Sequence, residues 1–224
     1  MKKELLLLTM ALLCLGTSAS ADSFTTFATR AQQNPTDIYD WSQLGAAGTV
    51  FNTPLGVTSF NGLNATLDIG AGLQGKRVDE GNGWTGNFEL GETLVWTQGN
   101  GNLTMTFASG VSSVGLELES DLFGAYTGTM NVFVGGIDAF HLPVKGVSNP
   151  NEDGSAAFLG VGDLTGSNIT KIVLSSMDHQ GRNDFAINDL SITQGPPIPE
   201  PSSIVLLGSG LLGVAGVLRR KLGR

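Results

Sequence analysis

Short stretches in which apolar and polar residues alternate, joined by glycine-rich turns, dominate the middle of this 224-residue chain. Leu103, Met105 and Phe107 alternate with polar residues in one such stretch, and residues 114–119 repeat the pattern. A period of two is that of a β-strand with one buried face. The 32 glycines also disfavour long helices, so the chain is expected to be built from strands.

The strand pattern recurs often enough to predict a fold class. Alternating stretches separated by short turns predict an all-β fold, an antiparallel β-sandwich of the jelly-roll kind. In the last stretch the apolar parity changes, which predicts a bulge near Asn188 and Asp189. Only residues 35–44 favour a helical turn, with Asp37 as its cap. The further stretches are residues 66–69, 93–97, 129–134, 139–144, 156–161, 169–175 and 185–192.

The first 21 residues have the three parts of a secretory signal. Two lysines precede an apolar run over residues 5–15, and small residues follow as far as Ala21. This order predicts a signal peptide, helical in its apolar part, which signal peptidase would remove after Ala19 and Ala21 bind in its shallow pockets. Cys14 is the only cysteine, so the mature chain would hold no disulfide and no thiolate metal site.

The sequence of the C-terminal end predicts a linker, a transmembrane helix and a basic tail. Residues 195–203 are rich in proline, and residues 204–218 form an uncharged apolar run. Fifteen residues span only about 22 Å, so the predicted transmembrane helix is short. The basic tail over 219–224 is expected to stay cytoplasmic, which leaves the body, residues 22–194, on the outer side. The tail begins with Arg219, Arg220 and Lys221.

The segment Pro199-Glu200-Pro201 followed by SSIVLLGSGLLGVAGVLRRKLGR closely resembles the PEP-CTERM sorting signal of Gram-negative bacteria. In that family an exosortase, a membrane cysteine protease, recognises the signal and is thought to cut near the motif. The resemblance implies that Pro199, Glu200 and Pro201 are the recognition site, together with the basic cluster beyond the helix. It also implies a precursor anchored transiently in the inner membrane. The mature form would lie at the cell surface or outside the cell, with exopolysaccharide and biofilm matrix as its surroundings.

The body carries a second and weaker resemblance. The stretches GNGWTGNFELGETLVW and DFAINDLSI, within residues 80–192, are similar to the bodies of many uncharacterised PEP-CTERM proteins. This resemblance implies a β-sandwich reminiscent of carbohydrate-binding modules. It transfers no catalytic residue.

Charge is distributed unevenly along the chain. The body holds 18 of the 20 acidic residues and six of the 12 basic ones, a formal charge of −12, which disfavours nucleic acid as a partner. Two oxygen-rich loops are candidate calcium ligands: Asp79, Glu80 and Asn82 in one, Asn151 and Asp153 in the other. The second loop is not an EF-hand, because glycine stands where the bidentate glutamate is required. Calcium is therefore a possible cofactor, with hydrated turns as the alternative.

Two tryptophans are candidates for binding sugar rings by stacking. Trp41 and Trp84 lie beside polar turns, whereas Trp96 follows Leu94 by two residues and is expected in the core. An exposed indole beside an acidic loop would favour a glycan-binding module. Burial of both rings is the alternative.

Paired carboxylates are the remaining candidates for chemistry. Glycoside hydrolysis needs two carboxyl groups, which Glu89 with Glu92 or Glu117 with Glu119 could supply. The second pair alternates with leucines, so it is expected to face solvent and to protect a sheet edge. We therefore expect an exported protein without catalytic activity. A carbohydrate-binding module and a glycan hydrolase are the alternatives.

Overall fold

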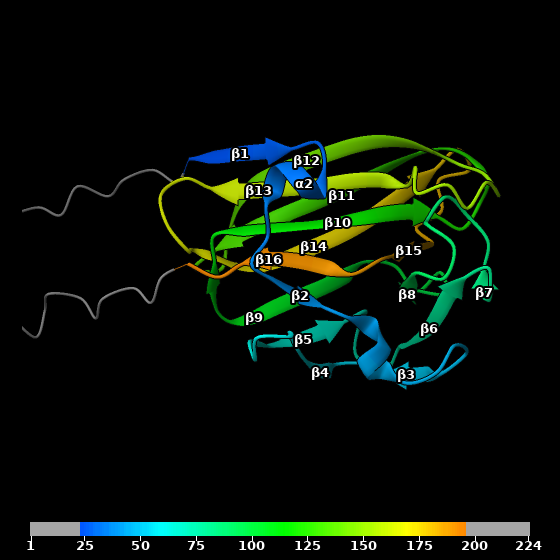
Figure 1. Ribbon diagram of the computed structural model, residues 1–224, viewed down its shortest axis with the longest axis horizontal. Coiled ribbons are helices and arrows are strands. Elements are labelled where there is room, and N and C mark those ends of the chain that lie inside the picture. The colour runs from blue at the N-terminus through cyan, green and yellow to red at the C-terminus, as the bar shows by residue number, and fades with distance from the viewer. Residues whose placement is uncertain (1–22, 196–224) are drawn as a thin grey trace, which may run out of the picture.

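The computed structural model describes residues 23–195, which fold into two β-sheets packed face to face (Figure 1). The helical pieces of this region are α2 (Arg30–Gln33) and the 3-10 helix η1 (Trp41–Leu44). Its strands are β1 (Phe24–Phe27), β2 (Asp37–Tyr39), β3 (Val50–Asn52), β4 (Leu55–Thr58), β5 (Asn64–Asp68), β6 (Gln74–Glu80), β7 (Gly83–Trp84), β8 (Thr93–Trp96), β9 (Leu103–Val111), β10 (Ser113–Ser120), β11 (Gly124–Val134), β12 (Ile137–Ser148), β13 (Ala157–Asp163), β14 (Ile169–Asp178), β15 (Phe185–Ile187) and β16 (Leu190–Thr193).

The two sheets differ in size. Sheet A has ten strands, seven of them in the order β1-β13-β10-β15-β8-β6-β3, while β16 pairs with β10 and β2, and β7 with β6. Sheet B has six, in the order β12-β11-β14-β9-β5-β4. Within residues 23–195 only the β6–β7 pair is parallel, so the predicted antiparallel sandwich is confirmed. The predicted signal helix and transmembrane helix lie outside the described residues. Between residues 23 and 195 no helix is long and apolar enough to cross a membrane.

The core lies between the sheets and follows the alternation in the sequence. Leu103 and Met105 of β9 are fully buried from sheet B, as are Leu116 and Leu118 of β10 from sheet A. Burying one such side chain contributes about 1.5–3 kcal/mol to the free energy of unfolding. Because the period is two, a shift of register by one residue would move the apolar set to the outside, so the pattern also fixes the pairing.

The expected bulge near Asn188 is a complete break between two strands. β15 pairs with β10 and β8, whereas β16 pairs with β10 and β2. Asn188 and Asp189 lie between the two strands. At this point the strand paired on one side changes from β8 to β2, and the inward-facing residues change from odd to even numbers. The change of partner, rather than one extra residue, explains the parity shift in the sequence.

The helical turn predicted for residues 35–44 is shorter than expected and has a different cap. Residues 37–39 form strand β2, and η1 is capped by Asp40, whose Oδ1 accepts a hydrogen bond of 2.7 Å from the Ser42 N–H. Asp37 instead accepts bonds from the Asn61 N–H and the Gln194 side chain. The prediction that Asp37 caps the turn is wrong, because its carboxylate is engaged by residues distant in sequence.

The outer face of sheet A is covered rather than open to solvent. A second apolar cluster lies there, built from Val78, Trp84, Phe88, Leu94, Ala156 and Ala186 with Trp96 beside it. Helix α2 covers another part of the same face, where buried Gln33 donates to the Ser113 hydroxyl and to the Ser191 carbonyl, both at 3.2 Å. We call residues 84–93 the cover segment. Polar side chains on this face of β10 therefore lie under protein.

The two ends of the described chain leave from the same end of the sandwich (Figure 1). The Leu164 N–H donates to the Ser23 carbonyl at 2.8 Å, and Gly195 packs on Ser167 of the same loop. Strand β13 runs toward this loop and starts at the opposite end, which carries the turn at residues 81–83 and the loop over 149–156. We call that opposite end the acidic end.

Candidate functional site

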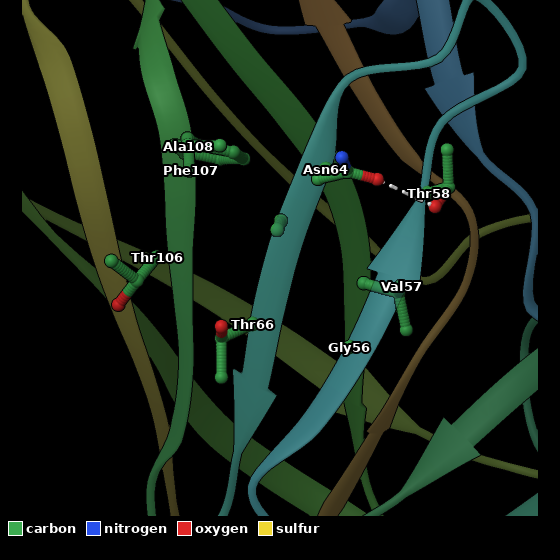
Figure 2. A pocket seen from close by; sticks show the side chains of 9 residues that line it. Gly56, Val57, Thr58, Asn64, Thr66, Thr106, Phe107 and Ala108 are labelled. Atoms are coloured by element: carbon green, nitrogen blue, oxygen red, sulfur yellow. Dashed lines mark hydrogen bonds between the residues drawn. The ribbon is translucent and has the colours of Figure 1, made fainter.

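A hollow lined by three threonines and one asparagine together with glycine and apolar residues lies on the outer face of sheet B (Figure 2). Its volume is about 530 Å³, and it spans strands β4, β5 and β9. Thr66 and Thr106 are exposed register partners on adjacent strands, and the Thr58 hydroxyl donates to Asn64 Oδ1 at 2.9 Å. Hydroxyls and amides both donate and accept hydrogen bonds, as sugar hydroxyls do. Sequence reasoning missed this hollow, because its residues are separated along the chain.

A second polar group is organised around buried Asn188 under the cover segment. The Asn188 amide N–H₂ donates to Glu117 Oε2 at 2.6 Å and to Glu92 Oε1 at 3.2 Å. Its Oδ1 accepts from the Glu117 N–H at 2.8 Å and from Arg30 at 3.1 Å. Burial, then the charge of Glu92, raises the pKa of Glu117 to about 7. Glu117 therefore does not face solvent at a sheet edge, and that prediction is wrong because β10 is central in sheet A.

A cleft of about 300 Å³ lies beside this group. It is lined by Asp40, Glu92 and Asp189 together with small and polar residues. The Thr93 hydroxyl is 3.3 Å from one carboxylate oxygen of Asp40 and 3.3 Å from one of Asp189. Burial, then the charge of Asp40, raises the pKa of Asp189 to about 6. The predicted pair Glu89 and Glu92 is adjacent, since the Glu89 N–H donates to Glu92 Oε2 at 3.2 Å, but Glu89 does not line the cleft.

The two oxygen-rich loops of the sequence meet at the acidic end. Glu89 and Asp153 form an isolated β-bridge, and the Glu152 N–H donates to the Gly86 carbonyl at 2.8 Å. The side-chain nitrogen of Asn87 is 2.8 Å from Ser155 Oγ and 3.4 Å from Asp153 Oδ1. The cover segment thus connects two loops that are about 70 residues apart in the sequence.

The individual residues predicted as calcium ligands have different surroundings. Asp79 forms an ion pair of 2.7 Å with Arg77, and Asp153 accepts bonds from Ser155. Asn82 and Asn151 are exposed at the loop surfaces. Glu80 points into the protein and is 1% exposed. Within residues 23–195 no three His, Cys, Asp or Glu side chains are arranged to hold a metal ion.

A carboxylate whose burial the sequence did not suggest lies next to Glu80. Glu119 is 0% exposed and its Oε2 accepts from the Asn87 N–H at 2.7 Å. The Gly86 N–H donates to Glu80 Oε1 at 2.8 Å, and a Cβ on Gly86 would overlap the Glu119 carboxylate. Burial raises the pKa of both Glu80 and Glu119. Glu119 was expected to face solvent, and it does not because the cover segment lies over it.

Neither predicted sugar-stacking tryptophan has an exposed ring. Trp41 is fully buried in the main core, and its Nε1 donates to the Asn188 carbonyl at 2.8 Å. Trp84 is 5% exposed and packs against Phe88 and Trp96. The alternative stated from the sequence, buried packing, describes both rings. A glycan-binding surface on this structure would have to use other side chains.

Comparison with known families identifies the C-terminal signal. The family model described as the PEP-CTERM protein-sorting motif matches residues 197–221. The chain therefore carries a sorting signal for exosortase, which marks an exported protein for the cell surface. The matched residues, like the predicted signal-peptide site at Ala19 and Ala21, lie outside the described part of the structure. No curated protein matches the sequence.

Proposed function

We propose that the mature protein is a non-enzymatic module of the cell surface or extracellular matrix, delivered there by exosortase. The observation that carries this proposal is the sorting motif at residues 197–221. In the proposed order, signal peptidase removes residues 1–21, the apolar segment over 204–218 holds the precursor in the inner membrane, and exosortase acts at the Pro-Glu-Pro motif. The sandwich is then released or transferred as a folded body.

Processing can be tested with Glu200→Ala in a host that contains an exosortase. We expect a longer, membrane-retained form that keeps Arg224, whereas Ser203→Ala, a control three residues further on, should be processed normally. Intact-mass spectrometry of the secreted and membrane fractions defines both termini. If the wild-type protein in that host keeps Arg224 at its mature end, the sorting proposal is wrong.

We propose further that the hollow on sheet B binds the exopolysaccharide of the matrix. Support comes from its exposed hydroxyl and amide side chains, including Thr66 and Thr106, and from the absence of net charge among its lining residues. Affinity electrophoresis of the purified chain in gels containing host exopolysaccharide measures binding. Thr66→Val with Thr106→Val should abolish the retardation, whereas Thr26→Val on β1 of sheet A should not. Equal retardation of all variants would remove the hollow as the binding surface.

A second candidate function, glycan hydrolysis, is favoured by the cleft beside Thr93. A carboxyl group with a raised pKa next to an ionised carboxylate is the arrangement of an acid and its partner in glycosidases. Asp189 has such a pKa, and Asp40 and Glu92 line the same cleft. Release of reducing sugars from host polysaccharide by the wild type, lost in Asp189→Asn, would replace the non-enzymatic proposal. No release by the wild type at pH 5 to 7 would remove this candidate.

A further inference from the structure

We propose that Glu80, Glu119 and Asn149 form a binding site for a divalent cation of the calcium type at the acidic end. This proposal goes beyond sorting and matrix binding, and it does not depend on either of them. Its residues differ from the exposed loop positions that the sequence suggested. Only Glu80 is common to both sets.

The first support is a group of buried oxygens that have no hydrogen-bond partner. Glu80 Oε2, Glu119 Oε1 and Asn149 Oδ1 are each inaccessible to solvent and lack a hydrogen bond of standard geometry, and the Ser148 hydroxyl lies beside the Glu119 carboxylate, where it partly offsets the rise in pKa. Glu80 is 1% exposed, Glu119 0% and Ser148 2%. Buried polar atoms in folded proteins almost always have partners, and a buried carboxylate oxygen without one is strongly disfavoured. Three such oxygens, two on sheet A and one on the loop over 149–156, therefore call for a ligand.

The second support is that two consecutive residues connect these side chains. The Gly86 N–H binds one oxygen of Glu80, and the Asn87 N–H binds one oxygen of Glu119. Asn87 Oδ1 accepts the Asn149 N–H at 2.7 Å. The three proposed ligands are thus positioned around Gly86 and Asn87. Each glutamate keeps its second carboxylate oxygen, and Asn149 its single side-chain oxygen, without a hydrogen bond of standard geometry. A glycine is required at position 86, because a Cβ there would overlap the Glu119 carboxylate.

The donor set selects the kind of ion. Two carboxylates and an amide oxygen are hard oxygen ligands, which suit Ca²⁺ with its six to eight oxygens. Imidazole and thiolate ligands, which suit zinc and copper, are not among these side chains. The negative charge of Glu152, which acts on Glu80, adds to the attraction for a cation. Water would complete the coordination, since the protein supplies fewer than six oxygens.

The main test compares thermal midpoints of the purified full-length chain in 1 mM CaCl₂ and in EGTA at matched ionic strength. A site with a Kd of about 10 μM should raise the midpoint by about 5–10 °C. Asp138→Asn, which removes an exposed carboxylate on the β12 hairpin, is the charge control and should keep the whole shift. Glu119→Gln should lose it.

A second readout separates binding from a structural role of Glu119. The Trp84 indole nitrogen is 3.5 Å from Glu119 Oε2, so Tb³⁺ in the site should show luminescence on excitation of tryptophan. Glu119→Gln and Glu80→Gln should lose this signal, and in EGTA they should melt no lower than the wild type, because each removes an uncompensated buried charge. Equal midpoints of the wild type in calcium and in EGTA would overturn the proposal. So would a calcium shift that survives in Glu119→Gln and Glu80→Gln.

Discussion

Several carboxyl groups that lie under the cover segment or beside it have a pKa above that of an exposed carboxyl group. Asp189 is one such case outside the proposed cation site, because burial and the charge of Asp40 raise its pKa to about 6. An acid whose pKa is higher in the folded state holds its proton more tightly there than in the unfolded chain. Its contribution to stability is therefore complete below about pH 4 and is lost as the pH rises through about 6.

Replacing Asp189 with asparagine should accordingly increase the free energy of unfolding only at higher pH. At pH 7.5 we expect Asp189→Asn to raise the free energy of unfolding by about 1 kcal/mol relative to wild type, a value that allows for partial solvent screening. At pH 4 the two proteins should have the same free energy of unfolding, or the variant should be slightly less stable. Urea unfolding at both pH values measures the difference, with Asp138→Asn as an exposed control. A stability difference between variant and wild type that is the same at both pH values would contradict a raised pKa of Asp189 in the folded state.

At the scale of the element, one side chain ties the two sheets together. Tyr126 of β11 in sheet B donates its hydroxyl to the Leu118 carbonyl of β10 at 2.6 Å and accepts the Ala157 N–H of β13 at 3.2 Å. Gly146 on the neighbouring strand lies directly against the ring, where a Cβ would overlap it. The tyrosine thus crosses from one sheet to two strands of the other. The only other tyrosine, Tyr39, is buried with an unpartnered hydroxyl.

This contrast supplies a matched pair of substitutions. Tyr126→Phe leaves a buried N–H without its acceptor and should lower the free energy of unfolding by about 2 kcal/mol. Tyr39→Phe removes an oxygen that makes no bond and should be neutral or slightly stabilising. Equilibrium unfolding in urea measures both. Equal losses in the two variants would mean that the hydroxyl of Tyr126 does not connect the sheets.

Sequence periodicity predicted the strands that have one apolar side, and it failed where the outer side is also covered. Strand β9 was found through Leu103 and Met105. Strand β6 was missed because the residues that share the inward parity of Gly75 are Arg77 and Asp79, so its sequence shows no apolar alternation. The burial of Glu119 depends on the cover segment folding back over β10, which no local pattern records. The two oxygen-rich loops were identified from composition, but their meeting at one end is a property of the topology.

On the scale of the whole molecule, the sandwich should fold without its two ends. The core of the described structure extends from Tyr39 to Ile192, and the sequence has no cysteine between residues 23 and 195. The outer strand of sheet B, β12, carries Pro143 and Lys145, which discourage pairing with a second copy. These features favour a monomer.

Residues 22–194 expressed alone should therefore give a monomer in gel filtration and a circular dichroism spectrum dominated by β-structure. A reducing agent should leave the thermal midpoint unchanged, because there is no disulfide to break. The full-length chain in detergent serves as the reference for the spectrum. A mainly helical spectrum, or the lack of a cooperative melt, would show that the fold needs the end segments.

The common exit of the two chain ends gives the molecule a direction. Residues 23 and 195 both leave beside the loop over 164–168, and the buried carboxylates lie at the far end of the sandwich. A link to any support made through the C-terminal segment therefore attaches the body at one pole only. Whether that support is a membrane, a polymer or a sensor chip, the pole carrying Glu80 and Glu119 lies on the side of the body opposite the point of attachment.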